Sequence, residues 1–75
     1  MFGDYLEQVA IETVHVGDFV FIDPPARPSG ARCVIAKRAK GNERSTRTIG
    51  WLVELAGGDL AWWPRGASVW RRRVA

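Results

Sequence analysis

Residues 57–73, with the sequence GGDLAWWPRGASVWRRR, contain three of the four tryptophans and four of the eleven basic residues of the chain. An exposed indole ring can stack on a nucleobase, while guanidinium groups neutralise phosphates. The same residue types also form hot spots of protein interfaces and internal cation–π contacts. The candidate binding residues are Trp63, Arg65, Trp70, Arg71, Arg72, Arg73, Lys37, Arg38, Lys40, Arg44 and Arg47.

Residue types that support catalysis are scarce. His15 and Cys33 are the only histidine and the only cysteine, which excludes an internal disulfide and a Cys/His zinc site. We find no Ser/His/Asp set and no glycine loop of the phosphate-binding kind. The sequence therefore predicts a non-enzymatic protein with no metal and no cofactor.

Charge is distributed unevenly along the chain. Residues 1–26 hold five acidic residues and no Lys or Arg, whereas residues 27–75 hold eleven basic and three acidic residues, a balance of 11 − 3 = +8. Such asymmetry indicates an anionic partner, of which nucleic acid is the first candidate. The alternative is that the two parts attract each other within the fold.

The length of 75 residues predicts one domain over residues 1–75, in which residues 1–13 are an N-terminal extension. A chain of this size buries only ~60% of its unfolded surface, so its stability is marginal. The first 14 residues lack the basic and apolar regions of a signal peptide, and no run approaches the ~20 apolar residues of a membrane span. We therefore expect a cytoplasmic protein that does not bind membranes.

Short runs rich in Val, Ile, Trp and Thr alternate with Gly, Pro and Asp clusters, a pattern typical of an all-β barrel or sandwich. Residues 4–11 form either a helical turn or a short strand. A tight hairpin turn is expected at residues 56–59 and a turn, of 3₁₀ type, at residues 64–67. Five strands are predicted at residues 19–22, 31–38, 47–55, 60–63 and 68–73.

Alternation of side chains assigns the faces of these strands. In residues 47–55 the predicted core face holds Ile49, Trp51, Val53 and Leu55. Residues 19–22 are apolar on both faces, so Phe19 and Phe21 need a cover, either residues 1–12 or a second copy in a homo-oligomer.

The adjacent residues Trp62 and Trp63 must point to opposite faces of their strand. Trp62 shares its face with Leu60 and is predicted to be the core residue. Trp63 precedes Pro64 and is predicted to lie on the surface beside Arg65.

The order of these elements resembles a five-stranded SH3-like barrel over residues 14–73. The segments VHVGDFV, GWLVELAGGDLAWWP and RGASVWRR carry the resemblance, which extends to small uncharacterised proteins of high-GC bacteria and their phages. Because SH3-like barrels serve many functions, the resemblance implies a fold rather than an activity.

A second, architectural resemblance is to the plasmid-borne type II dihydrofolate reductases, tetramers of SH3-like barrels around a shared pore. It rests on the segment GDFV at residues 17–20, on residues 50–54 and on Trp63-Pro64. That family uses a Val-Gln-Ile-Tyr strand in its site, where this chain has Leu60, Ala61, Trp62 and Trp63. The resemblance thus implies a related architecture without the same site chemistry.

Together these observations predict a binding module that recognises nucleic acid or a nucleic-acid-associated protein through an Arg/Trp surface. The first alternative is a protein-interaction module, phage-encoded, that modulates a host protein. The second alternative is a reductase relative that lacks the usual active-site strand.

Overall fold

The computed structural model describes residues 4–22, 30–41 and 47–74, and in this part of the chain it is all-β, as predicted. Between the first two strands lies one 3₁₀ turn, η1 (Ile11–Thr13). The predicted loops at residues 23–29 and 42–46 lie outside the described residues. The six strands are β1 (Asp4–Ala10), β2 (Phe19–Phe21), β3 (Arg32–Gly41), β4 (Thr48–Leu55), β5 (Leu60–Pro64) and β6 (Ser68–Val74).

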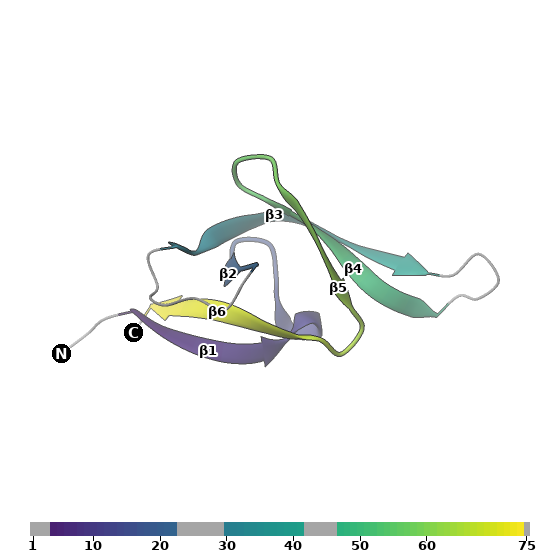
Figure 1. The fold of residues 1–75 in the computed structure, drawn as a ribbon, viewed down its shortest axis with the longest axis horizontal. Coiled ribbons are helices and arrows are strands. Elements are labelled where there is room, and N and C mark those ends of the chain that lie inside the picture. The colour runs from purple at the N-terminus through teal and green to yellow at the C-terminus, as the bar shows by residue number, and fades with distance from the viewer. Residues whose placement is uncertain (1–3, 23–29, 42–46, 75) are drawn as a thin grey trace.

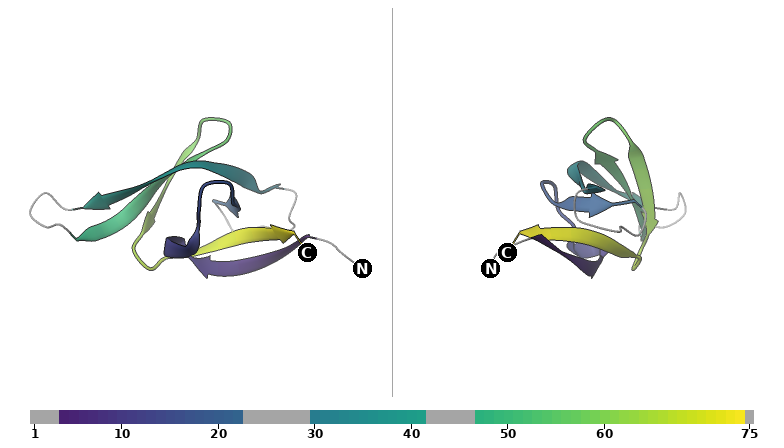
Figure 2. Two further views of the ribbon diagram at one scale, coloured as in Figure 1. Left: turned by 180° about the vertical axis from the view of Figure 1, so that it is seen from behind. Right: turned by 60° about the vertical axis from the view of Figure 1, so that its left-hand side comes forward.

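The strands form one antiparallel sheet in the order β1-β6-β2-β3-β4-β5. Figure 1 shows that the sheet folds over itself, so that β3, β4 and β5 lie across one side of the molecule and β1 and β6 across the other. The view from behind in Figure 2 shows the same two layers. In the described residues β1 and β5 are the two edges and do not pair, so hydrogen bonds do not close the sheet into a complete barrel.

The core lies between the two layers and is made of small and medium aliphatic side chains. Val9, Trp51, Trp63 and Ala67 pack around it as partly buried residues. The fully or nearly buried members are Ile11, Val14, Val20, Val34, Val53, Leu55, Ala61 and Val69.

The hairpin turn between β4 and β5 forms where the sequence predicts it. Gly57 and Gly58 have φ values of 98° and 95°, in the left-handed region that glycine occupies without steric cost. The Leu55 N–H donates to the Asp59 carbonyl at 2.8 Å, which closes the turn.

Residues 4–10 form a strand rather than a helical turn. β1 pairs along its whole length with β6, from Asp4 opposite Val74 to Ala10 opposite Ser68. The following turn η1 inserts the completely buried Ile11 into the core. The segment predicted as an extension is therefore part of the sheet.

The phenylalanines of β2 are covered within the chain. Phe21 is 7% exposed and Val20 is fully buried. The Arg72 guanidinium carbon lies 4.4 Å from the ring centre of the half-buried Phe19. Phe19 and Phe21, the two residues that suggested a homo-oligomer, are thus half-buried and buried within the chain, whereas Ile22 is 49% exposed.

The predicted core face of β4 is correct for Trp51, Val53 and Leu55 but wrong for Ile49. Ile49 is 50% exposed because the pairing between β3 and β4 shifts register between Lys40 and Gly41, so that Ile49 has no partner on β3. This end of the β3–β4 hairpin also projects beyond the layer of β1 and β6 (Figure 1).

Candidate nucleic-acid interface

The side of β3, β4 and β5 that faces away from the core forms the candidate site, which we call the outer face. Directly opposed residues of antiparallel strands share one face, so the register defines its three cross-strand rows. These rows are Ala36–Glu54–Leu60, Arg38–Leu52–Trp62 and Lys40–Gly50–Pro64.

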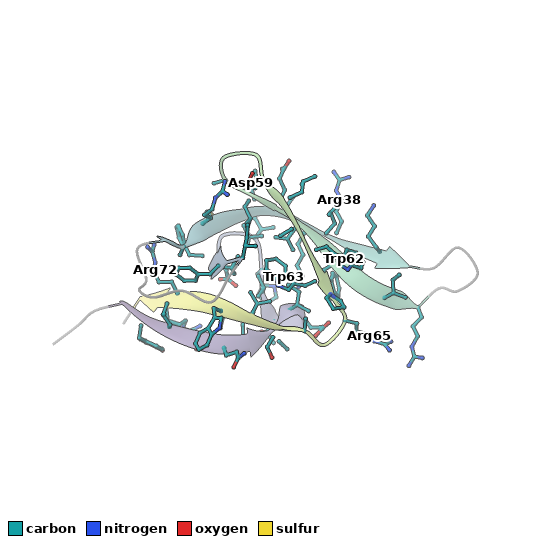
Figure 3. The ribbon with its side chains drawn as sticks, viewed as in Figure 1. Arg38, Asp59, Trp62, Trp63, Arg65 and Arg72 are labelled. Carbon is teal, nitrogen blue, oxygen red and sulfur yellow. The ribbon has the colours of Figure 1, made fainter. Side chains whose placement is uncertain are left out.

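The two adjacent tryptophans of β5 have roles opposite to those predicted. Trp62 is 47% exposed on the outer face, whereas Trp63 is half-buried and packs against the core. Ala61 and Trp63 oppose Val53 and Trp51, which face the core, so the register carries Leu60 and Trp62 outwards. Figure 3 shows Trp63 directed into the space between the two layers.

Trp62 lies over the backbone of β4. Gly50 is buried although it is on the outer face, because the Trp62 ring covers it. A Cβ atom at this position would overlap that ring. Glycine thus allows the indole to approach the β4 backbone closely, while about half of the Trp62 surface stays exposed.

A pocket of about 230 Å³ opens on the outer face beside Trp62. It is lined by Ala36, Arg38, Leu52, Glu54 and Leu60. Its volume is below the ~300–1,000 Å³ of pockets that enclose drug-sized ligands.

Arg38 and Lys40 are exposed cations of the outer face, and Arg65 is a third exposed cation near its end. Arg65 directly follows Pro64, at the end of β5. Within residues 4–22, 30–41 and 47–74, no carboxylate lies within ion-pair distance of these three side chains. Figure 3 shows Arg38 directed away from the core.

The predicted arginines of β6 lie elsewhere and make contacts within the fold. The Arg71 guanidinium donates to Glu7 Oε1 from Nε at 2.8 Å and to Asp18 Oδ2 from Nη1 at 3.2 Å. The hydrogen bond with Glu7 is the main cause that raises the pKa of Arg71. Arg72 contacts Phe19, and Arg73 Nε lies 3.7 Å from Glu7 Oε1.

Arg72 and Arg65 lie well apart along the long axis of the molecule (Figure 3). The arginines of β6 and the arginines near the outer face, Arg38 and Arg65, therefore do not form one continuous surface. Arg32, outside the predicted set, forms an ion pair with Asp59.

Lys37 belongs to the core side of β3. Its ammonium group donates to the carbonyls of Ile11 at 2.8 Å and Val14 at 2.7 Å, and it lies 4.4 Å from the centre of the Trp51 ring. Burial lowers the pKa of Lys37, against the opposing effects of Glu12 and Asp18. Lys37 thus joins η1 to the sheet rather than lying on the outer face.

Glu12 completes this internal connection. Its Oε2 accepts hydrogen bonds from the Gly66 N–H at 3.0 Å and from Trp51 Nε1 at 2.9 Å. These two donors, the backbone N–H first, lower the pKa of Glu12. The carboxylate ties η1 to both β4 and the turn before β6.

The remaining predicted residues are dispersed. Trp70 is half-buried beside the inward-pointing Val69, Arg47 is exposed next to the start of β4, and Arg44 lies outside the described residues. Alternation placed Leu52 and Glu54 together on the side of their strand away from the core, but it assigned neither to the binding set. It wrongly placed Leu60 and Trp62 in the core. Only the strand pairing shows that all four share the outer face.

Two further features are absent from the described residues. No group of three or more His, Cys, Asp or Glu side chains there is placed to hold a metal ion. That part of the chain also has no helix with the length and apolar character needed to cross a membrane.

In comparisons with known proteins, no family model, no curated protein and no solved structure matches this chain. The outer face must therefore be interpreted from its own chemistry.

Proposed function

We propose that the protein is a non-enzymatic module that binds nucleic acid through the outer face of β3, β4 and β5. The observation that carries this proposal is the row formed by Arg38, Leu52 and Trp62. It places an exposed indole beside a cation that no described carboxylate neutralises.

The chemistry of this row suits an unpaired nucleotide. Trp62 offers one open ring face on which a base can stack, a contact worth ~1–3 kcal/mol. Arg38 and Lys40, two residues apart on the same side of β3, can follow the phosphates of one strand. Arg65 extends the positive charge past the end of β5.

A labelled single-stranded oligonucleotide of about 12 nucleotides, within the ~4–16 bound by one small barrel, tests the proposal by fluorescence anisotropy. We expect binding at about 50 mM salt that weakens as salt rises. Trp62→Ala should reduce the affinity roughly 5- to 150-fold, while Trp62→Phe should retain much of it.

Arg38→Ala tests the electrostatic part of the proposal against a matched control, Arg73→Ala. Both variants lose one positive charge, but Arg73 lies beside Glu7 on β6. Arg38→Ala should weaken binding clearly more than Arg73→Ala. Equal effects of both variants, or no binding at low salt, would contradict the proposed interface.

The second candidate is a protein-interaction module. It is favoured by Leu60, which is 61% exposed on the edge strand β5 next to Trp62. Aromatic and arginine side chains around an apolar centre are typical of protein interfaces. Absence of oligonucleotide binding, in a folded protein, would favour this candidate.

A further inference from the structure

We infer that the pocket beside Trp62 reads the base: Glu54 accepts hydrogen bonds from an exocyclic amino group while Arg38 donates to the neighbouring ring acceptor. We therefore expect the pocket to bind bases that carry an exocyclic amino group more tightly than thymine or uracil. This inference rests on the proposed function and specifies which nucleotides that site takes.

The position of Glu54 requires an explanation. It is the only acidic residue in the three rows of the outer face, where it lies between Ala36 and Leu60. A carboxylate repels phosphates, so it does not serve a surface that binds only the nucleic-acid backbone. Within the described residues no cation lies within ion-pair distance of it, so its oxygens are available to a ligand.

Arg38 and Glu54 border the same pocket from neighbouring strands. Arg38 pairs with Leu52, and Glu54 is two residues further along β4, so the two are diagonal neighbours on one face. Such neighbours lie ~7–8 Å apart, within reach of long side chains. Leu52 and Leu60 line the same pocket and supply apolar side chains against which a planar ring can pack.

The pocket is continuous with the stacking surface. Leu52, which lines the pocket, lies directly opposite Trp62, and Leu60 is two residues before Trp62 on the same face. One base can therefore stack on Trp62 while a ring edge extends over the two leucines. A paired base has its edge engaged, which favours single-stranded nucleic acid.

The donors and acceptors of this pocket distinguish the bases. An ionised carboxylate only accepts hydrogen bonds, and a guanidinium only donates them. Its five N–H groups allow Arg38 to contact a phosphate and a base edge at the same time. Cytosine carries an N4 amino donor where thymine carries the O4 acceptor. Cytosine can thus present its N4 amino group to Glu54 and its N3 acceptor to Arg38. In the same orientation thymine would present O4 to the carboxylate and N3–H to the guanidinium, so that neither contact forms a hydrogen bond.

The test compares oligodeoxycytidylate with oligothymidylate of equal length at neutral pH and constant salt, by competition against the labelled strand. We expect the wild-type protein to bind the cytosine strand at least about 5-fold more tightly, since a correctly satisfied polar base contact is worth ~1–3 kcal/mol. Oligodeoxyuridylate, which lacks the thymine methyl group, should behave like oligothymidylate.

Glu54→Gln should reduce this preference to within about twofold, because the amide can donate to the thymine O4 and carries no charge. Glu12→Gln is the matched control: it makes the same substitution at a side chain that contacts Trp51 and Gly66. It should leave the cytosine-to-thymine ratio unchanged.

The outcomes separate the two proposals. Equal binding of all strands, or a preference that Glu54→Gln does not alter, would overturn base reading by this pocket and leave the proposed interface intact. Failure of the folded protein to bind any strand would overturn the proposed function as well.

Discussion

Lys37 and Lys40 lie on the same strand but on opposite faces of the sheet, and the structure gives them different roles. Lys37 donates to two backbone carbonyls at the core side, whereas Lys40 is exposed and makes no ion pair with the described residues. A lysine used to satisfy buried carbonyls cannot also bind phosphate. Position in the register therefore separates structural cations from those available to a ligand.

Trp62 and Trp63 should differ sharply when each is changed to alanine. Trp63→Ala removes a partly buried ring from the margin of the core, and we expect a loss of ~2–4 kcal/mol, a large share of the stability of a small domain. Trp62→Ala should cost ~1 kcal/mol or less in stability, because Trp62 is 47% exposed and is not part of the core. Thermal and chemical denaturation of both variants measure the difference.

Equal destabilisation by the two changes would contradict the position of Trp62 on the outer face that the strand register indicates. Intrinsic fluorescence gives an independent check, since quenching by iodide should fall more after Trp62→Ala than after Trp63→Ala.

Glu12 should make the stability of the protein depend on acidic pH. Its pKa in the folded state is below the ordinary value of 4.5, so it stabilises the fold above that pH. This stabilisation should be lost as the pH falls from 4.5 through the lower pKa of the folded state. Urea denaturation across this range should show the free energy of unfolding declining.

Glu12→Gln should be less stable than the wild type near neutral pH and should show a flatter decline over the same acidic range. Trp51→Phe, which removes one of the two donors to Glu12, should give an intermediate profile. A Glu12→Gln variant whose stability depends on pH as steeply as the wild type would contradict the assignment.

At the scale of the element, the close approach of β5 to β4 depends on Gly50. An added Cβ would overlap the Trp62 ring and lie 2.9 Å from the Trp63 carbonyl oxygen. Gly50→Ala should therefore destabilise the protein by ~1–3 kcal/mol and displace Trp62. Chemical denaturation should therefore show a lower free energy of unfolding, and the affinity for the oligonucleotide should also fall.

A double-mutant cycle with Trp62→Ala measures this coupling. The loss caused by Gly50→Ala should be smaller when Trp62 is already alanine, because only the contact with the Trp63 carbonyl remains. Strict additivity of the two changes would show that the ring does not lie over Gly50.

The strand β1 shows how an element gains its place from a distant partner. Its acidic residue Glu7 binds Arg71, 64 positions later in the chain, across the β1–β6 pairing. The excess of acid before residue 27 thus partly serves to neutralise the arginines of β6. This agrees with the interpretation that oppositely charged parts of the chain attract each other.

At the scale of the whole molecule, these ion pairs reduce the number of cations available to an anionic ligand. With Arg38, Lys40 and Arg65 as the phosphate contacts, the slope of log K against log salt for a single strand should be ~−2, from ~0.7 for each of three contacts. Titration of a labelled oligonucleotide at several salt concentrations measures it.

The double variant Arg38→Ala/Lys40→Ala should reduce this slope to ~−0.7. A wild-type slope steeper than ~−4 would show that more of the basic residues, including those of β6, contact the ligand.

Local sequence patterns determined the all-β class, the positions of the five later strands and the glycine turn at residues 56–59. These features depend on the alternation of apolar residues and on backbone freedom, which neighbouring residues alone decide. The segment at residues 4–11 remained ambiguous, because an edge strand is stabilised by its partner and β6 is distant in the chain.

The candidate site depended on tertiary structure for a physical reason. Leu60 to Trp63 offers apolar side chains to both faces, so alternation cannot decide which face is inward; the pairing of Ala61 with Val53 does so and turns Trp62 outwards. The sequence gives the number of basic residues, but it does not show which of them form ion pairs with carboxylates. Strand order placed Arg71 against Glu7 and Asp18 and left Arg38 exposed beside Trp62.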